Sequence, residues 1–146
     1  MRPTPLVLAI VAALPPGHDA SQSGPIRVLI VDDHELFTHA LTATLEQDGR
    51  FEVVGTAATG REAVRAAKHA AVDVVLMDMS MPVLDGLAAT RRLLALEPAP
   101  RVIALSGHTD RLSQTAALES GASVFLPKSA AFETLTDTIL GVCDRT

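Results

Sequence analysis

The sequence predicts an α/β protein, a three-layer sandwich in which a parallel sheet lies between two layers of helices. Three observations support this fold class. From Ile26 onward, short apolar runs rich in β-branched residues alternate with segments of helical spacing. The runs are almost continuously apolar, as expected for strands that are covered on both faces. Five runs alternate with five helical segments, which indicates a (βα)5 unit.

The elements follow one another in a regular order along the chain. Strands are expected at residues 26–31, 51–57, 73–77, 101–105 and 122–126. Helices are expected at residues 34–47, 60–70, 85–96, 109–119 and 130–143. The first helix carries one apolar stripe, formed by Phe37, Leu41 and Leu45. The last helix carries a similar stripe, formed by Phe132, Leu135, Ile139 and Val142.

Several helix ends are marked by residues with known end preferences. Asp85 is suited to be the N-cap of the third helix, because its carboxylate accepts free amide hydrogens. Pro98 and Pro100 are expected to stop that helix, because proline lacks the amide hydrogen. Gly121 is expected to be the C-cap of the fourth helix.

Residues 1–25 differ in composition from the rest of the chain. A nine-residue apolar run, Leu6 to Leu14, is followed by proline, glycine, serine and aspartate. The run is shorter than the roughly 20 residues that span a bilayer. It follows Arg2 as the core of a signal peptide would, but no clear small-x-small cleavage site comes after it. We therefore expect a disordered N-terminal extension over 1–25, one folded domain over 26–144 and a cytoplasmic location.

Composition excludes several classes of function. The chain has 146 residues and a formal net charge of −5, and it lacks the lysine and arginine clusters that bind phosphates of nucleic acids. Its single cysteine, Cys143, cannot form an internal disulfide. No glycine-rich nucleotide-binding loop is present. We expect no direct binding to nucleic acid or to a membrane.

Polar side chains follow the predicted strands at the points where four of them end. These residues are Asp32, Asp33, Asp78, Ser106 and Lys128. In open α/β sheets, ligands bind outside the carboxyl ends of the strands. We therefore expect the five side chains to share one crevice.

The composition of this crevice indicates phosphoryl chemistry. Three converging carboxylates repel one another unless a cation is present, and Mg2+ prefers oxygen ligands of this kind. Lys128 and Ser106 are suited to contact phosphoryl oxygens. An aspartate, a magnesium site, a lysine and a hydroxyl can together make or break an acyl phosphate on a carboxylate.

Four segments carry a resemblance to a known family. They are "VLIVDDHELF", "DVVLMDMSMPVLDGL", "RVIALSG" and "GASVFLPKS". In order and spacing they resemble the signature segments of the response-regulator receiver domain of two-component signalling. The wording of "DDHELF" and "LPKS" is most similar to the subgroup that usually carries a C-terminal LuxR-type helix-turn-helix. The resemblance implies a flavodoxin-like fold with strand order 2-1-3-4-5.

The resemblance also implies a role for each site residue. Asp78 would be the phosphoacceptor, and Asp33 would ligate Mg2+ directly. Asp32 would act through a bound water, and the backbone carbonyl of Ser80 would be a further metal ligand. Lys128 would contact the phosphoryl group.

A second set of roles concerns the switch and the lifetime of the acyl phosphate. Movement of Ser106 toward the phosphoryl group would leave room for Phe125 to turn inward. Ser80 and His108 occupy the two variable positions that modulate how long the phosphoryl group survives. We expect His34 to be a first-turn helix residue without a metal role, since magnesium prefers oxygen.

The sequence departs from the family pattern near its end. Ser129 follows Lys128 where many members have proline, while Pro127 precedes the lysine, so the geometry of this loop is open. The chain ends directly after the fifth helix, and we expect no C-terminal effector domain in it. It is either a stand-alone receiver or a fragment.

The leading hypothesis is a phosphoacceptor module with no enzyme activity beyond its own phosphorylation and dephosphorylation. Its partners would be a histidine kinase or phosphotransfer protein, and an output partner or second copy at the face of the fourth helix, fifth strand and fifth helix. One alternative is a pseudo-receiver that acts without phosphorylation. Another is a phosphohydrolase of the haloacid-dehalogenase type, which would need an aspartate where this chain has Ser80.

Overall fold

The computed structural model describes residues 24–80, 86–107 and 110–144. Within these ranges, all five strands lie in one parallel sheet of order β2-β1-β3-β4-β5. The strands are β1 (Ile26–Val31), β2 (Phe51–Ala57), β3 (Val74–Asp78), β4 (Arg101–Ser106) and β5 (Val124–Pro127). The expected fold class and strand order are confirmed.

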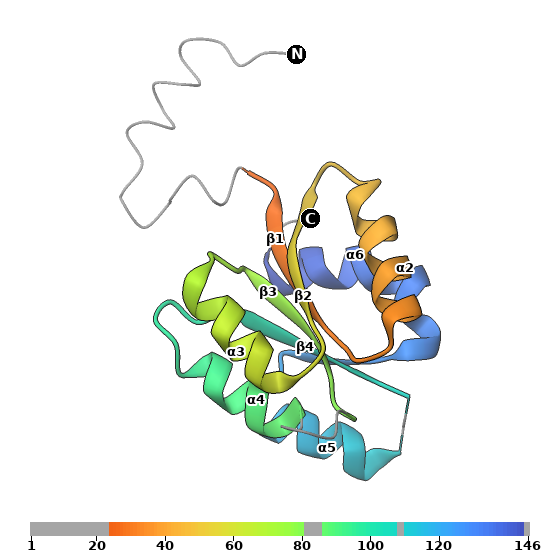
Figure 1. The fold of residues 1–146 in the computed structure, drawn as a ribbon. Coiled ribbons are helices and arrows are strands. Elements are labelled where there is room, and N and C mark those ends of the chain that lie inside the picture. The colour runs from red at the N-terminus through yellow and green to blue at the C-terminus, as the bar shows by residue number, and fades with distance from the viewer. Residues whose placement is uncertain (1–23, 81–85, 108–109, 145–146) are drawn as a thin grey trace.

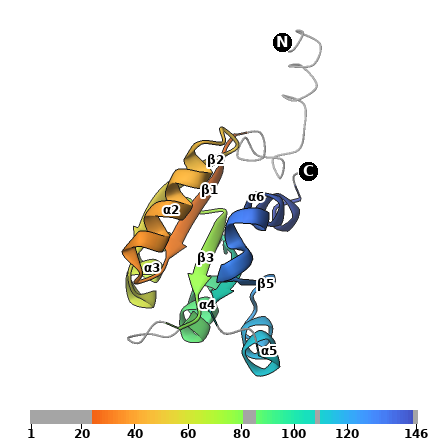
Figure 2. The same ribbon diagram turned by 90° about the vertical axis from the view of Figure 1, so that its right-hand side faces the viewer.

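Helices cover both faces of this sheet (Figures 1 and 2). They are α2 (Glu35–Glu46), α3 (Gly60–His69), α4 (Gly86–Leu94), α5 (Arg111–Glu119) and α6 (Ala131–Val142), with a short 3-10 helix η2 (Lys128–Ala130) before the last. Helices α2 and α6 lie on one face, while α3, α4 and α5 lie on the other. The sheet is therefore the middle of three layers.

Two apolar clusters fill the spaces between the layers. Alternate residues of a strand point to opposite faces, so Val28 and Ile30 pack with Leu41 of α2 and Leu135 of α6. The neighbouring residues of the same strand pack with the small side chains of α3, α4 and α5. Strand β3 is buried along its whole length, which explains its continuous apolar sequence.

The ends of two helices carry residues with the expected capping preferences. Thr59 is the N-cap of α3, and its hydroxyl accepts a hydrogen bond from the Glu62 amide at 3.1 Å. Gly121 lies just after α5 with φ of +112°, the backbone conformation that favours glycine, so its expected capping role is confirmed. Asp85 and its expected capping role lie outside the described residues, as do residues 1–23.

The third predicted helix ends earlier than its prolines suggested. Helix α4 stops at Leu94, four residues before Pro98. The amides of Ala95 and Leu96 donate to carbonyls three residues back, which is the tightening typical of a helix end. The helix is therefore ended by its own last turn, and the prolines follow it. None of the helices in the described ranges is long and apolar enough to cross a membrane.

Candidate phosphoryl-acceptor site

The parallel sheet brings three polar side chains together at its carboxyl edge. Asp32 directly follows β1, while Asp78 and Ser106 are the last residues of β3 and β4. All three are buried. Because β1, β3 and β4 are neighbours in the sheet, their ends meet in one place. The expected convergence of these residues is observed.

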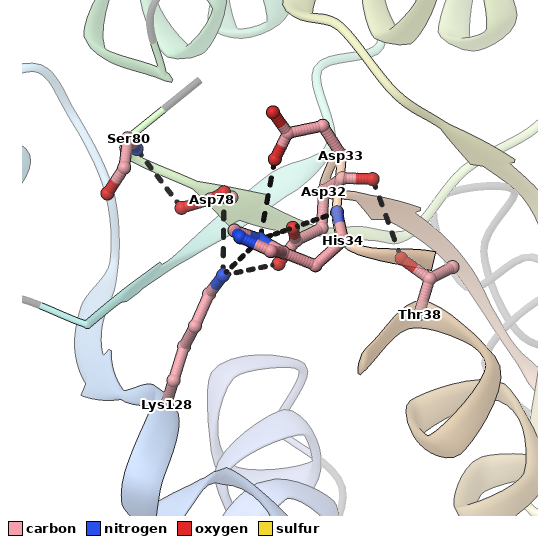
Figure 3. Close-up of polar contacts among 7 residues, drawn as sticks. All are labelled: Asp32, Asp33, His34, Thr38, Asp78, Ser80 and Lys128. Carbon is pink, nitrogen blue, oxygen red and sulfur yellow. Dashed lines mark hydrogen bonds and ion pairs between the residues drawn. The ribbon is translucent and has the colours of Figure 1, made fainter. Parts of the chain in front are cut away.

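Lys128 reaches this group from the fifth strand. Its ammonium Nζ lies 2.7 Å from Asp32 Oδ2 and 3.5 Å from Asp78 Oδ2 (Figure 3). Pro127 ends β5 in an extended conformation, and Lys128 begins the 3-10 helix that leads into α6. This tight turn settles the loop geometry that the sequence left open at Ser129.

The pKa values of the two inner aspartates shift in opposite directions, although burial acts to raise both. Burial raises the pKa of Asp78, and the charge of Asp32 adds to this, while the Ser80 amide and Lys128 oppose it. Burial also acts to raise the pKa of Asp32, but hydrogen bonds from Lys128 and His34 outweigh it, so this pKa is lowered. Lys128 is thus engaged mainly with Asp32, and Asp78 is the less satisfied carboxylate.

Asp78 is held in place by local contacts. Its Oδ1 accepts a hydrogen bond from the Ser80 amide at 3.0 Å, which orients the carboxylate. A Cβ added to Gly86, the first residue of α4, would lie 2.6 Å from the Asp78 carbonyl oxygen and 2.7 Å from the Met79 Cα. Glycine at this position therefore allows α4 to begin directly against the end of β3.

His34 lies directly against the carboxylates of the site. It is the N-cap of α2 with extended backbone, not a residue of its first turn. Its Nδ1 lies 2.9 Å from Asp32 Oδ1 and 3.4 Å from Asp33 Oδ1, and 3.4 Å from Lys128 Nζ. The expected place in the first helical turn was wrong by one residue, and the cap geometry turns the ring back over the carboxylates.

The carboxylates can hold a hard divalent cation. Ligand atoms of Asp32, Asp33, His34 and Asp78 all lie within 4.8 Å of one another. Three of these four ligand atoms are carboxylate oxygens, and oxygen is the ligand that Mg2+ prefers. Asp33 is 39% exposed while Asp32 is fully buried. The donor set therefore fits magnesium, with an open side at Asp33.

Ser106 and Phe125 lie on the side of the site that faces α5. Ser106 lines a cavity of about 400 Å³ together with Met79, Ser80, Leu87, Leu112, Ser113 and Ala116. Phe125 is half-buried and packs against the cluster between the sheet and α3, α4 and α5. His108, the second expected lifetime-modulating residue, lies outside the described residues.

One residue near the site was missed from the sequence. The Phe37 ring lies beneath Lys128, with Nζ 4.8 Å from the ring centroid. The sequence placed Phe37 correctly on the apolar stripe of α2. The stripe alone did not show that its N-terminal residue, Phe37, contacts Lys128. A phenylalanine three residues after the "DDH" segment was the available signal.

The fold and these side chains first define a class: a doubly wound α/β domain with buried aspartates and a lysine at the carboxyl edge of its sheet. Comparison with known proteins then identifies the family. The family model described as response regulator receiver domain matches residues 28–140. The chain belongs to this family.

Relatives and solved structures agree with this assignment. The chain is 40% identical over 117 residues to the response regulator UvrY of Escherichia coli (strain K12), covering 80% of this chain and 54% of that protein. It is 41% identical over 104 residues to a protein-glutamate methylesterase/protein-glutamine glutaminase of Vibrio parahaemolyticus, covering 70% of this chain and 28% of that protein. The chain thus spans about half or less of these relatives.

Solved structures give the same result. The signal receiver domain of the putative response regulator NarL from Mycobacterium tuberculosis has a TM-score of 0.78 and 30% identity, over 83% of this chain and 98% of that chain. The response regulator domain of Thermotoga maritima CheB has a TM-score of 0.76 and 29% identity, over 84% of this chain and 98% of that chain.

Proposed function

We propose that this chain is the phosphoacceptor module of a two-component phosphorelay and that Asp78 receives the phosphoryl group. The observation that carries the proposal is the state of Asp78. Its carboxylate is fully buried at the end of β3, its pKa is raised by burial, and a lysine ammonium lies 3.5 Å away. A poorly solvated carboxylate beside a cation is suited to attack phosphorus.

The proposed transfer starts from a phosphohistidine of a histidine kinase or a phosphotransfer protein. A carboxylate oxygen of Asp78 forms a bond to phosphorus as the phosphorus–nitrogen bond of the donor breaks. The electron pair of that bond returns to the donor imidazole, which then takes up a proton. Lys128 and Ser106 contact the phosphoryl oxygens, and Lys128 balances the charge that builds up on them.

Asp33, Asp78 and the backbone carbonyl of Ser80 would hold the Mg2+ ion directly, and Asp32 would act through a water. When bound there, the ion would supply positive charge against the carboxylates and the phosphoryl oxygens. Asp32 already has a partner in Lys128 at 2.7 Å, whereas Asp33 is partly exposed. This difference supports the assignment of Asp33 as the direct ligand.

The phosphoryl group would change the surface through Ser106 and Phe125. Ser106 moves toward the phosphoryl oxygens, and Phe125 turns into the space beside it. The affected face is formed by α5, β5 and α6, which would bind an output partner or a second copy. Ser80 and His108 set the lifetime of the acyl phosphate. The chain would act in the cytoplasm and have no enzyme activity beyond its own phosphorylation and dephosphorylation.

The test is incubation with Mg2+ and acetyl phosphate, followed by intact mass measurement. Wild type should gain one phosphoryl group, and Asp78→Asn should gain none. Asp48→Asn, a partly exposed aspartate at the other edge of the sheet, is the matched control and should be labelled like wild type. An unlabelled wild type, under conditions that label an authentic receiver, would overturn the proposal and favour a pseudo-receiver. Turnover of phosphate esters would favour a phosphohydrolase.

A further inference from the structure

The Lys128 ammonium lies over the face of an aromatic ring. Its Nζ is 4.8 Å from the centroid of Phe37, a half-buried residue in the first turn of α2. We propose that Phe37 is a positioning residue for Lys128, whose ring face holds the ammonium beside Asp32 and Asp78 until the phosphoryl group arrives. This inference rests on the proposed phosphoacceptor function.

Lys128 has to be positioned without a further strong ion pair that would keep its ammonium from the phosphoryl oxygens. Its side chain is long and flexible, and it already has three polar neighbours: Asp32 at 2.7 Å, Asp78 at 3.5 Å and His34 at 3.4 Å. A further carboxylate would bind the ammonium and compete with the phosphoryl oxygens. The face of a neutral ring attracts a cation without adding a charge. An aliphatic side chain would fill the space but would give no such attraction.

The burial of the lysine makes this attraction effective. The Lys128 side chain is only 17% exposed, so little water screens the ammonium from the ring. Cation–π attraction is stronger where the cation is desolvated. The ring therefore adds an attraction to the ammonium that water screens only weakly.

A second ring supports the orientation of the first. Phe132, in the first turn of α6, contacts Phe37 edge to face, with ring centroids 5.5 Å apart and an interplanar angle of 75°. Aromatic pairs prefer this geometry. Phe132 follows Lys128 by four residues, so both the lysine and the supporting ring come from the same turn of chain. The pair Phe37 and Phe132 fixes the position of the lysine relative to α2.

The sharpest test changes the charge distribution of the ring but hardly its shape. In the variant that carries 3,5-difluorophenylalanine in place of Phe37, the fluorines withdraw electron density and weaken the negative potential at the face of the ring. We expect the rate of phosphorylation by acetyl phosphate, at saturating Mg2+, to fall roughly threefold. Phe37→Leu should lower it roughly 3- to 10-fold, and Phe132→Leu should have a smaller effect in the same direction. Thermal unfolding of each variant shows that it is folded.

A second readout does not depend on phosphorylation. Because Lys128 Nζ lies over the ring, the NMR signals of the adjacent ε-methylene protons should be shifted upfield by the ring current in wild type. The shift should persist in the difluoro variant, in which a ring remains, and vanish in Phe37→Leu. Equal phosphorylation rates in wild type and the difluoro variant, or an absent upfield shift in wild type, overturn the inference. If wild type shows the shift but is not phosphorylated, the proposed function fails while the contact itself stands.

Discussion

The two edges of the sheet carry ion pairs of similar chemistry but very different burial. At the amino edge, Arg50 pairs with Asp48 at 2.6 Å and Arg27 with Glu52 at 3.1 Å, and these side chains are between 25% and 55% exposed. At the carboxyl edge, Lys128 meets two aspartates whose side chains are fully buried.

The difference in burial separates ion pairs whose charges are balanced from a buried group with more negative than positive charge. Hydrogen bonds from Arg50 lower the pKa of Asp48 to about 2, so this pair is charged at any ordinary pH. At the carboxyl edge, burial raises the pKa of Asp78 and one lysine serves two buried carboxylates. Exposed pairs contribute little to stability, whereas a buried group with excess negative charge is ready to accept a cation. The comparison teaches that location, not residue type, decides which charges are functional.

The largest expected effect comes from removing the buried cation. Lys128→Met should lower the free energy of unfolding at pH 7 by about 3 kcal/mol, because it leaves two buried carboxylates without a cation. Arg50→Met, the matched change at the exposed edge, should leave the stability close to that of wild type. Denaturant unfolding of both variants measures the contrast. Equal losses at the two edges would show that burial is not the deciding factor.

Removing the less satisfied carboxylate should have the opposite sign. Asp78→Asn should raise the free energy of unfolding at pH 7 by about 1 to 2 kcal/mol, because a buried charge is replaced by a neutral group of the same shape. A raised pKa means that the folded state holds the Asp78 proton more tightly than the unfolded state. The cost therefore develops as pH rises above about 3.8, the ordinary pKa.

The pH dependence provides the check on this variant. Its stability advantage over wild type should be present at pH 7 and shrink as pH falls through the raised pKa of Asp78 toward the ordinary value. Asp32 should behave in the opposite way: its lowered pKa contributes stability above about 3.8, which is lost as pH falls through the folded-state value. Unfolding curves for Asp78→Asn and wild type measure the trend. They should run from about pH 7 down to about pH 4, close to the pKa of roughly 3.9 expected of a free aspartate.

The two neighbouring aspartates sharpen the comparison within the carboxyl edge. Asp33→Ala should weaken Mg2+ binding about tenfold or more, because a direct oxygen ligand is lost. Asp32→Ala should weaken it less, since Asp32 is expected to act through water. Calorimetric titration of each variant with Mg2+ measures both affinities. Equal losses would contradict the assignment of direct and indirect ligands.

A buried polar group outside the site gives the smallest effect. Thr90 of α4 is fully buried, and its hydroxyl has no hydrogen-bond partner among the described residues. Thr90→Val should raise the free energy of unfolding by about 1 kcal/mol, because an unsatisfied hydroxyl is removed with little change of shape. Denaturant unfolding measures this gain. A loss of stability would reveal a polar contact that the hydroxyl makes.

The sequence was sufficient for features that depend on local pattern. Strands β1 and β2 begin and end where their β-branched runs do, because a buried strand and its apolar run have the same extent. Asp78 and Lys128 could be placed in one site because parallel strands must bring their carboxyl ends together. In both cases the fold class alone determines the position.

Features that depend on side-chain direction could not be predicted in this way. His34 turns back over Asp32 because α2 begins one residue later than expected. Phe37 reaches Lys128 because η2 brings the lysine over the first turn of α2. The contact of Phe37 with Lys128 joins segments far apart in the chain, and the contact of His34 with Asp32 depends on the backbone at the helix N-cap. Neither contact is encoded in periodicity.

The close approach at Gly86 has a consequence for how this chain can vary through evolution. Alanine is the smallest possible change there, yet its methyl group would meet backbone atoms of Asp78 and Met79, which cannot rotate away. Gly49 and Gly141 have no heavy atom within 4 Å of an added Cβ. Descendants of this sequence are therefore free to change those two glycines, while any lineage that keeps α4 packed against Asp78 and Met79 must inherit Gly86 unchanged.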